Sequence, residues 1–240
     1  EMAKIIDETG IQFRVLNSSK GPAVHGFRAQ ADKDRYKNAM RRVLENTDNL
    51  DLIFEEVDEL IIENSAVKGV RTAKGTEIKA ASVVITTGTF LNGLIHLGLT
   101  SRPAGRVGEK PSTKLSQSFL AAGFELGRLK TGTPPRLKRD SIDFSQCTLQ
   151  PGDDVPRPFS FSTHSIDRKQ VPCHLTATNE RTAQVIRDNL HLSPLYSGVI
   201  DGVGPRYCPS IEDKVVKFPD KNSHNIFLEP EGLDTDWIYP

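Results

Sequence analysis

The order of the first apolar patterns constrains this chain of 240 residues most strongly. Apolar residues recur at helical spacing within residues 28–50, and residues 46–49 then supply stop signals. Short strand-like stretches follow, with turns at residues 63–65 and 74–75, which is typical of a small β-meander. An unbroken apolar run at residues 83–85 then favours a buried parallel strand. A helix, a meander and a buried strand in this order indicate an α/β domain.

The composition of the chain changes near Gly93. Beyond it, proline and glycine are frequent and long stretches show no regular pattern. We therefore expect a domain boundary there, with one domain over residues 1–93 and another over residues 94–240.

Three elements are predicted in the second part of the chain. Residues 111–123 predict a helix that is capped by Ser112. Residues 179–190 predict another helix with Asn179 as its cap. Residues 224–230 predict a short strand.

The composition is that of an ordinary globular protein, with 37% hydrophobic and 26% charged residues and a formal net charge of zero. Global charge therefore gives no case for a nucleic acid or a membrane as partner. The charge is uneven, because residues 101–140 hold nine Lys or Arg against three Asp or Glu, whereas residues 201–240 hold four against eight. The basic stretch could meet phosphate groups, or the two stretches could be solvated faces of opposite sign.

Three cysteines, Cys147, Cys173 and Cys208, are widely spaced and form no CxxC motif. This pattern argues against a disulfide framework and against a zinc site, and no metal is expected. Reduced thiols favour the cytoplasm or a similar compartment. No apolar run is long enough to span a membrane, and residues 1–10 lack the apolar core of a signal peptide.

Cys208 lies beside a predicted helix start. Ile211, Val215 and Phe218 recur at helical spacing, and proline is favoured at a first helical position, which predicts that Pro209 begins the helix. The positive end of a helix dipole favours thiolate, so Cys208 is a candidate nucleophile. The alternative is a small buried hydrophobic residue in front of a helix.

Three further patterns each have two interpretations. Gly88 follows the apolar run and allows the close backbone approach that a dinucleotide needs, although most strand-end glycines are turn residues. Residues 127–139 place five Lys or Arg around a Gly-Thr-Pro-Pro turn, which suits a phosphate site or a solvated hairpin. Cys173 and His174 could form a nucleophile–base pair, but a structural histidine is the simpler interpretation.

Several long segments together resemble the MnmG (GidA) family, the flavoprotein subunits of a tRNA wobble-uridine modification system. The segments are "GPAVHGFRAQADKDRY", "ITTGTFLNG", "GRLKTGTPPR", "IDFS", "QVPCHLTATNE", "SPLYSGVIDGVGPRYCPSIEDK" and "IFLEPEGLDTDWIYP". They follow one another over nearly the whole chain, and several are long and unusual. The related folate- and flavin-dependent tRNA uridine methyltransferases share part of the fold and are an alternative.

The resemblance implies a fold similar to that of glutathione reductase, in which an FAD domain is interrupted by an inserted α/β domain associated with NAD. Residues 1–93 would be part of the FAD domain, and residues 94–240 would form the inserted domain and the return toward the FAD domain. Such proteins act with the GTPase MnmE, and the full-length protein is expected to be a homodimer. Together they add an aminomethyl or carboxymethylaminomethyl group to carbon 5 of the wobble uridine, using methylenetetrahydrofolate, FAD and NADH.

The resemblance also assigns residues. It implies FAD contacts at Val57 and Ser112, and Gly88 is a further cofactor candidate. The matching NAD-associated stretch consists of Gly204, Pro205, Arg206, Tyr207, Cys208, Pro209, Ser210, Ile211, Glu212, Asp213, Lys214, Val215, Val216, Lys217 and Phe218. Cys208 matches a functional cysteine, and a thiolate that adds to carbon 6 of uridine makes carbon 5 nucleophilic.

The chain departs from the family pattern in what it lacks. There is no GxGxxG loop, which would hold the FAD pyrophosphate, and the family's second cysteine and C-terminal helical region have no counterpart. We therefore expect this chain to be inactive alone and to bind FAD weakly or not at all. A non-catalytic module that binds tRNA or a partner is a second hypothesis. A disulfide reductase is disfavoured, because the cysteines are not paired.

Overall fold

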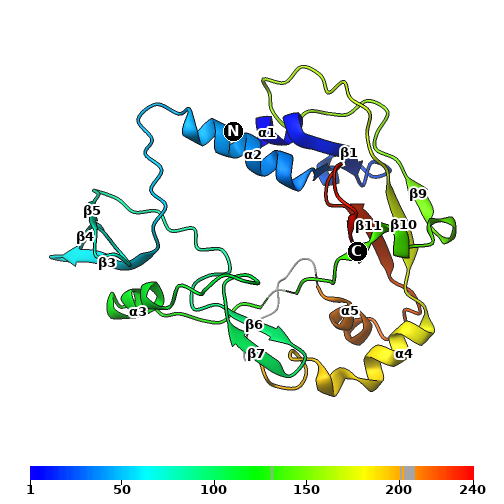
Figure 1. The fold of residues 1–240 in the computed structure, drawn as a ribbon. Helices are drawn as coiled ribbons and strands as arrows, with labels where there is room; N and C mark the ends of the chain where they lie inside the picture. Colours follow the sequence, from blue (N-terminus) through cyan, green and yellow to red (C-terminus); the bar gives the residue numbers. More distant parts are fainter. Residues whose placement is uncertain (131, 201, 203–208) are drawn as a thin grey trace. The chain divides into compact units, whose positions relative to one another are not determined.

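The computed structural model describes residues 1–130, 132–200, 202 and 209–240. Contacts divide the chain into two compact units that interleave along the sequence (Figure 1). The first unit comprises Glu1–Leu52, Thr133–Ala183 and Phe218–Pro240, and the second comprises Ile53–Gly132 and Gln184–Lys217. The boundary near Gly93 between two cofactor domains stays a prediction.

The first unit begins with a small helix–hairpin layer. Helix α1 (Met2–Thr9) packs on α2 (Lys33–Glu45) and leads into the antiparallel strands β1 (Gly10–Leu16) and β2 (Gly26–Ala31). The helix predicted in residues 28–50 is confirmed as α2, although its expected first residues belong to β2.

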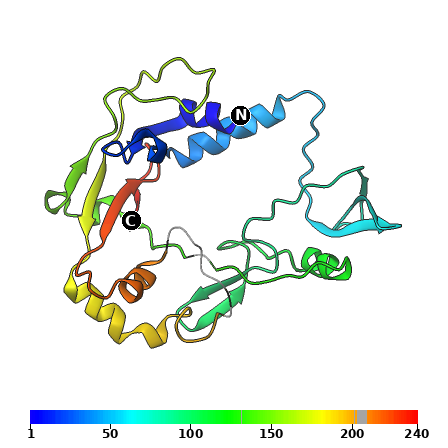
Figure 2. The ribbon, with the colours of Figure 1, turned by 180° about the vertical axis from the view of Figure 1, so that it is seen from behind.

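The first unit also contains an antiparallel sheet in which β10 and β11 lie side by side (Figure 2). Its order is β8-β12-β11-β10-β9. The strands are β8 (Leu137–Lys138), β9 (Thr148–Gln150), β10 (Cys173–Ala177), β11 (Asn225–Pro230) and β12 (Trp237–Tyr239). The strand predicted at residues 224–230 is confirmed as β11.

The core of the first unit combines apolar packing with one buried amide. Phe13 is 1% exposed and lies against Phe159, with ring centroids 6.5 Å apart. The buried Gln12 side chain donates to the Gln150 carbonyl at 2.9 Å and accepts from the Cys173 thiol at 3.3 Å. A buried amide is costly unless it is paired, so these bonds fix the β1–β2 hairpin on the sheet.

The second unit contains the predicted meander, in which β3 (Val57–Glu63), β4 (Ala66–Thr72) and β5 (Glu77–Lys79) pair in sequence order. Its first turn uses positive φ at Asn64 and Ser65, as a tight hairpin requires. The meander prediction is therefore confirmed.

The remaining elements of the second unit are short. Strands β6 (Leu94–Leu97) and β7 (Thr100–Pro103) form a hairpin, which precedes α3 (Thr113–Ala121). Helix α4 (Glu180–Asp188) passes from the first unit into the second, and α5 (Ile211–Lys217) follows. The predicted helices α3 and α4 are confirmed, and Asn179 caps α4 by accepting from the Thr182 N–H at 3.0 Å.

The buried strand predicted at Val83–Ile85 is wrong. Residues 82–87 have no strand pairing, and Val84 is 87% exposed. An apolar run becomes a strand only when another strand satisfies its backbone groups, and no described strand pairs with this one.

Asp32 gives a test of the first unit. Its buried carboxylate accepts from the Arg35 N–H at 2.9 Å, which caps α2, and from the Leu233 N–H at 2.8 Å. We expect Asp32→Ala to lower the free energy of unfolding by about 1–3 kcal/mol, measured by urea denaturation. Asp34→Ala, an exposed residue in the same helical turn, serves as the control. Equal effects of the two substitutions would contradict this role for Asp32.

Candidate functional site

The second unit contains a cavity of about 600 Å³, in the range of small-molecule sites. It lies against the meander, the segment at residues 83–90 and the start of α3. The lining residues are Glu55, Glu56, Val57, Val70, Val83, Val84, Ile85, Thr86, Thr87, Phe90, Lys110, Ser112 and Leu115.

Val57 and Ser112, which the family resemblance singled out, line this same cavity although they are far apart in the sequence. The walls are mainly apolar: Leu115, which is 5% exposed, lies on the α3 side, and Phe90 also faces the cavity. The wall at Val84 is open to solvent. Apolar walls that also carry several polar side chains suit a flat ring system with polar substituents.

Ser112 is held by its backbone. Its N–H donates to the Phe90 carbonyl at 2.8 Å, and its carbonyl accepts from the Asn92 N–H at 3.0 Å. The residue occupies the predicted N-cap position of α3, but its side chain makes no capping hydrogen bond. The hydroxyl at the cavity wall therefore keeps its hydrogen-bonding capacity for a ligand.

The loop that leads to Ser112 depends on two glycines. A Cβ on Gly93 would lie 2.5 Å from the Ala104 carbonyl oxygen, and one on Gly105 would lie 2.1 Å from the Phe90 ring. Gly88 has φ +55°, and a Cβ there would meet nothing within 4 Å. The space beside Gly88 is compatible with the predicted close approach of a ligand, which stays a prediction.

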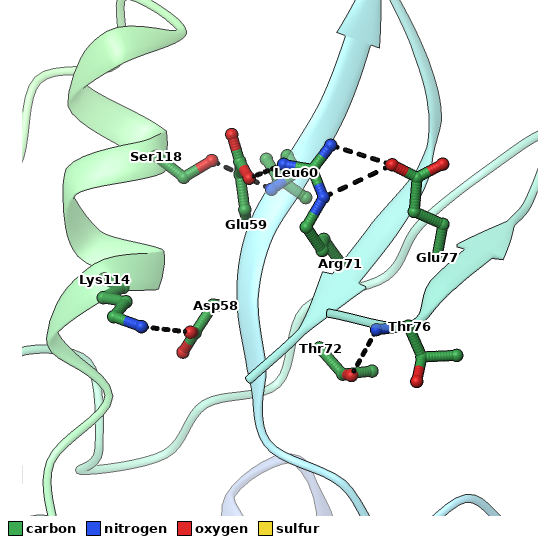
Figure 3. A network of polar contacts seen from close by, with 9 residues as sticks. All are labelled: Asp58, Glu59, Leu60, Arg71, Thr72, Thr76, Glu77, Lys114 and Ser118. Atoms are coloured by element: carbon green, nitrogen blue, oxygen red, sulfur yellow. Dashed lines mark hydrogen bonds and ion pairs between the residues drawn. The ribbon is translucent and has the colours of Figure 1, made fainter. Parts of the chain in front are cut away.

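Two polar contacts join β3 to α3, as Figure 3 shows. The Lys114 ammonium donates to Asp58 Oδ2 at 2.7 Å, and Ser118 Oγ accepts from the Leu60 N–H at 2.9 Å. The hydrogen bond to Asp58, reinforced by its charge, raises the pKa of Lys114. Sequence reasoning missed all of these residues, because nothing local in the sequence marks a contact across more than fifty positions.

Glu55 places an acidic group on the cavity wall. Its Oε1 accepts from the Lys74 ammonium at 3.0 Å. Hydrogen bonds, the largest from Thr72 and the next from Lys74, lower the pKa of Glu55 below its usual value. Glu55 is therefore held in its ionised form beside Lys74, and Lys110 brings a cation to the same cavity, so the lining offers polar groups of both signs to a ligand.

The NAD-associated stretch is described only from Pro209 onward. Gly204–Cys208 lie outside the described residues, so the assignment of Cys208 stays a prediction. The expectation that Pro209 begins the helix is wrong, because α5 begins at Ile211. Ser210 takes the capping role instead, since its Oγ lies 3.4 Å from the Asp213 nitrogen. Of the predicted apolar stripe, Val215 is buried at 4% exposure, whereas Phe218 follows the helix and is 51% exposed.

Asp213 has a structural role in α5. Asp213 is 6% exposed, and its carboxylate accepts from the Tyr196 hydroxyl at 2.7 Å and lies 3.8 Å from the Lys217 ammonium. Burial, followed by the hydrogen bond from its hydroxyl to Asp213, raises the pKa of Tyr196 to about 12. This pair anchors α5 to the segment that contains Tyr196.

The basic loop at residues 127–139 does not present all its cations freely. Arg128 donates to the Asn92 carbonyl at 2.9 Å in the second unit. Arg136, in the first unit, donates to Glu231 Oε1 at 2.6 Å and lies 4.3 Å from the Tyr239 ring centroid. For Arg136 these contacts favour a structural role over phosphate binding.

Cys173 and His174 do not form a nucleophile–base pair. Adjacent residues of a strand point to opposite faces, and Cys173 is fully buried against Gln12. Burial raises the pKa of the Cys173 thiol, whereas burial and the Arg139 charge lower the pKa of His174. His174 packs on the Phe144 ring at 4.4 Å. The structural interpretation of this histidine is therefore favoured.

Within the part of the chain that the structure describes, no group of three or more His, Cys, Asp or Glu side chains could hold a metal ion. The described helices include none long and apolar enough to cross a membrane.

A cavity with mainly apolar walls, set between a meander and a helix in a protein of mixed helix and sheet content, is the candidate small-molecule site. The family model "Glucose inhibited division protein A" matches residues 1–240. The chain therefore belongs to the GidA family.

Relatives and solved structures agree with this assignment. The chain is 58% identical over 240 residues to the tRNA uridine 5-carboxymethylaminomethyl modification enzyme MnmG of Geotalea uraniireducens. The match covers 100% of this chain and 38% of that protein. The form I crystal structure of Aquifex aeolicus GidA matches with a TM-score of 0.92 and 54% identity, over 100% of this chain and 41% of that one. The form II crystal matches with a TM-score of 0.89 and 51% identity, over 100% of this chain and 39% of that one.

The chain thus spans about 38% of the length of such relatives.

The buried thiol gives a test by alkylation. Because burial raises the pKa of Cys173, we expect it to resist iodoacetamide at pH 8 in the folded protein and to react after unfolding in urea. Above about pH 8.5 the thiol ionises more readily in the unfolded chain than in the folded protein. The free energy of unfolding therefore falls as the pH rises. Peptide mapping by mass spectrometry measures the rates, with the less buried Cys147 as the reference thiol. Equal rates in the folded protein would show that Cys173 is accessible.

Proposed function

We propose that this chain is part of a flavoprotein that modifies carbon 5 of the wobble uridine in tRNA. The observation that carries the proposal is the shared cavity: Val57 and Ser112, the two residues matched to FAD contacts, line it from separate elements. The names of the MnmG relatives, with 55–58% identity over this chain, supply the reaction.

The residues present fit a flavin dinucleotide. The apolar wall formed by Val57, Phe90 and Leu115 suits an aromatic ring, and the Ser112 hydroxyl and Glu55 carboxylate suit polar groups of a nucleoside. We assign the cavity to FAD, which supplies the redox step when bound. In this proposal the protein fold is the glutathione-reductase-like FAD domain with an inserted NAD-associated domain.

We assign the nucleophilic role to Cys208 from its match to the family. In this proposal its thiolate adds to carbon 6 of uridine, and the resulting enolate makes carbon 5 able to accept the one-carbon unit. The Tyr196–Asp213 contact supports the proposal indirectly, because it anchors the helix that follows the cysteine. NADH is assigned to the stretch at residues 204–218.

The remaining parts of the proposal follow from the family. Methylenetetrahydrofolate donates the carbon, NADH reduces the flavin, and the GTPase MnmE and tRNA are the partners. The intact protein is proposed to be a cytoplasmic homodimer. The alternative is a non-catalytic module that binds tRNA or a partner. In that case tRNA binding would be intact, and modification by the intact enzyme would not depend on Cys208.

Filling the cavity tests its assignment. We expect Leu115→Trp in the intact protein to weaken FAD binding roughly tenfold or more, because the larger side chain occupies the ligand space. Leu120→Trp on the same helix is the matched control, since Leu120 is 55% exposed and does not line the cavity. Flavin absorbance per protein and fluorescence titration measure the binding. Normal flavin content in Leu115→Trp would place the cofactor elsewhere.

Replacing the cysteine tests the nucleophile. We expect Cys208→Ser in the intact enzyme to retain flavin content and thermal stability but to lose tRNA modification with MnmE and methylenetetrahydrofolate, because serine is a much weaker nucleophile. Cys147→Ser is the control and should modify tRNA normally. Modification by Cys208→Ser at near wild-type rates would make Cys208 a structural residue.

A further inference from the structure

We propose that Asp58, Lys114 and Ser118 are positioning residues for the cofactor cavity. They clamp β3 to α3, so that Val57 on the strand and Ser112 in front of the helix line one cavity. The inference rests on the proposed function, because it assigns these residues to the same FAD site.

The strand side of the clamp is an irregularity in β3. Val57 pairs with Thr72 and Glu59 pairs with Arg71, which leaves Asp58 as the extra residue of a β-bulge. A bulge redirects the side chain of the strand in which it occurs. Asp58 is only 15% exposed and meets the Lys114 ammonium at 2.7 Å. The bulge therefore places a carboxylate on the side of the strand that α3 covers.

The second contact satisfies the free edge of the meander. β3 is the outer strand of its three-stranded sheet and pairs only with β4 there. The Leu60 N–H, on this edge strand, donates to Ser118 Oγ at 2.9 Å (Figure 3). An edge N–H that is partly shielded from water needs such an acceptor.

The helix side of the clamp has the matching spacing. Lys114 and Ser118 are four residues apart and lie on one face of α3. Leu115, next to Lys114, is buried and lines the cavity. The helix face that holds the strand thus borders the helix residue that forms the cavity wall. Asp58 directly follows Val57, and Lys114 follows Ser112 by two residues, so both contacts act close to the cavity residues.

Another ion-pair group in the same meander provides a matched control. Arg71 pairs with Glu59 and, at 2.9 Å, with Glu77, so it joins β3, β4 and β5 without reaching α3 (Figure 3). It does not line the cavity. Loss of Arg71 weakens the meander itself, whereas loss of Lys114 and Ser118 removes the two polar contacts that join the meander to the helix.

The experiment compares Lys114→Met/Ser118→Ala with Arg71→Met in the intact protein. Fluorescence quenching gives the FAD dissociation constant, and differential scanning fluorimetry gives the Tm of the apoprotein. We expect the clamp variant to bind FAD roughly tenfold more weakly. Arg71→Met should bind within about twofold of wild type at a comparable loss of Tm. The conservative variant Lys114→Arg/Ser118→Thr, which retains the cation and the hydroxyl, should recover most of the affinity.

The outcomes separate the positioning role of the three residues from the assignment of the cavity to FAD. Wild-type FAD affinity in Lys114→Met/Ser118→Ala, or an equal loss of affinity in Arg71→Met, overturns the positioning role while the cofactor site stands. Failure of the wild-type protein to bind FAD overturns both. If the double variant does not fold, the single variants Lys114→Met and Ser118→Ala carry the same comparison with Arg71→Met.

Discussion

The attachment of one edge strand to one helix is the constraint on which the candidate site depends. A three-stranded meander has little apolar area of its own, and its outer strand needs a covering element. Helix α3 supplies that cover through Lys114 and Ser118. Because Val57 and Ser112 lie directly beside these contacts, the attachment that covers the strand edge also shapes the cavity.

Other polar side chains that could have served chemistry are used by the fold. Arg136 is bound by Glu231 and Tyr239, Cys173 is buried against Gln12, and Asp213 anchors α5. Each of these groups has a partner that satisfies its charge or hydrogen-bonding capacity. Ser112 differs, since its hydroxyl makes no capping bond and the residue lines the cavity. This contrast favours the cavity as the place where the second unit meets a ligand.

Local patterns predicted the local structure well. Helical periodicity located α2, α3 and α4, and turn residues located the meander, because these elements depend on near neighbours. The strand predicted from the apolar run at Val83–Ile85 was wrong, since a strand also needs a pairing strand, which the run itself cannot specify. Pro209 predicted the start of α5 wrongly. The helix begins at Ile211, because Ser210 offers a side-chain cap that a proline cannot.

The site could be predicted only through resemblance. Val57 and Ser112 carry no local signal of a cofactor, and their shared cavity depends on contacts between distant parts of the sequence. The bulge at Asp58 was beyond prediction for the same reason, because a bulge is defined by the register of two strands. Family resemblance therefore identified two wall residues, and the structure identified what holds them together.

Hydrogen–deuterium exchange of the intact protein with and without FAD tests the central claim most directly. The account predicts that FAD slows exchange in the peptides that contain Val57, residues 83–90 and Ser112, and leaves the β8–β12 sheet strands of the first unit unchanged. Protection confined to that sheet, with residues 83–90 and Ser112 exchanging as before, would contradict the assignment of the cavity.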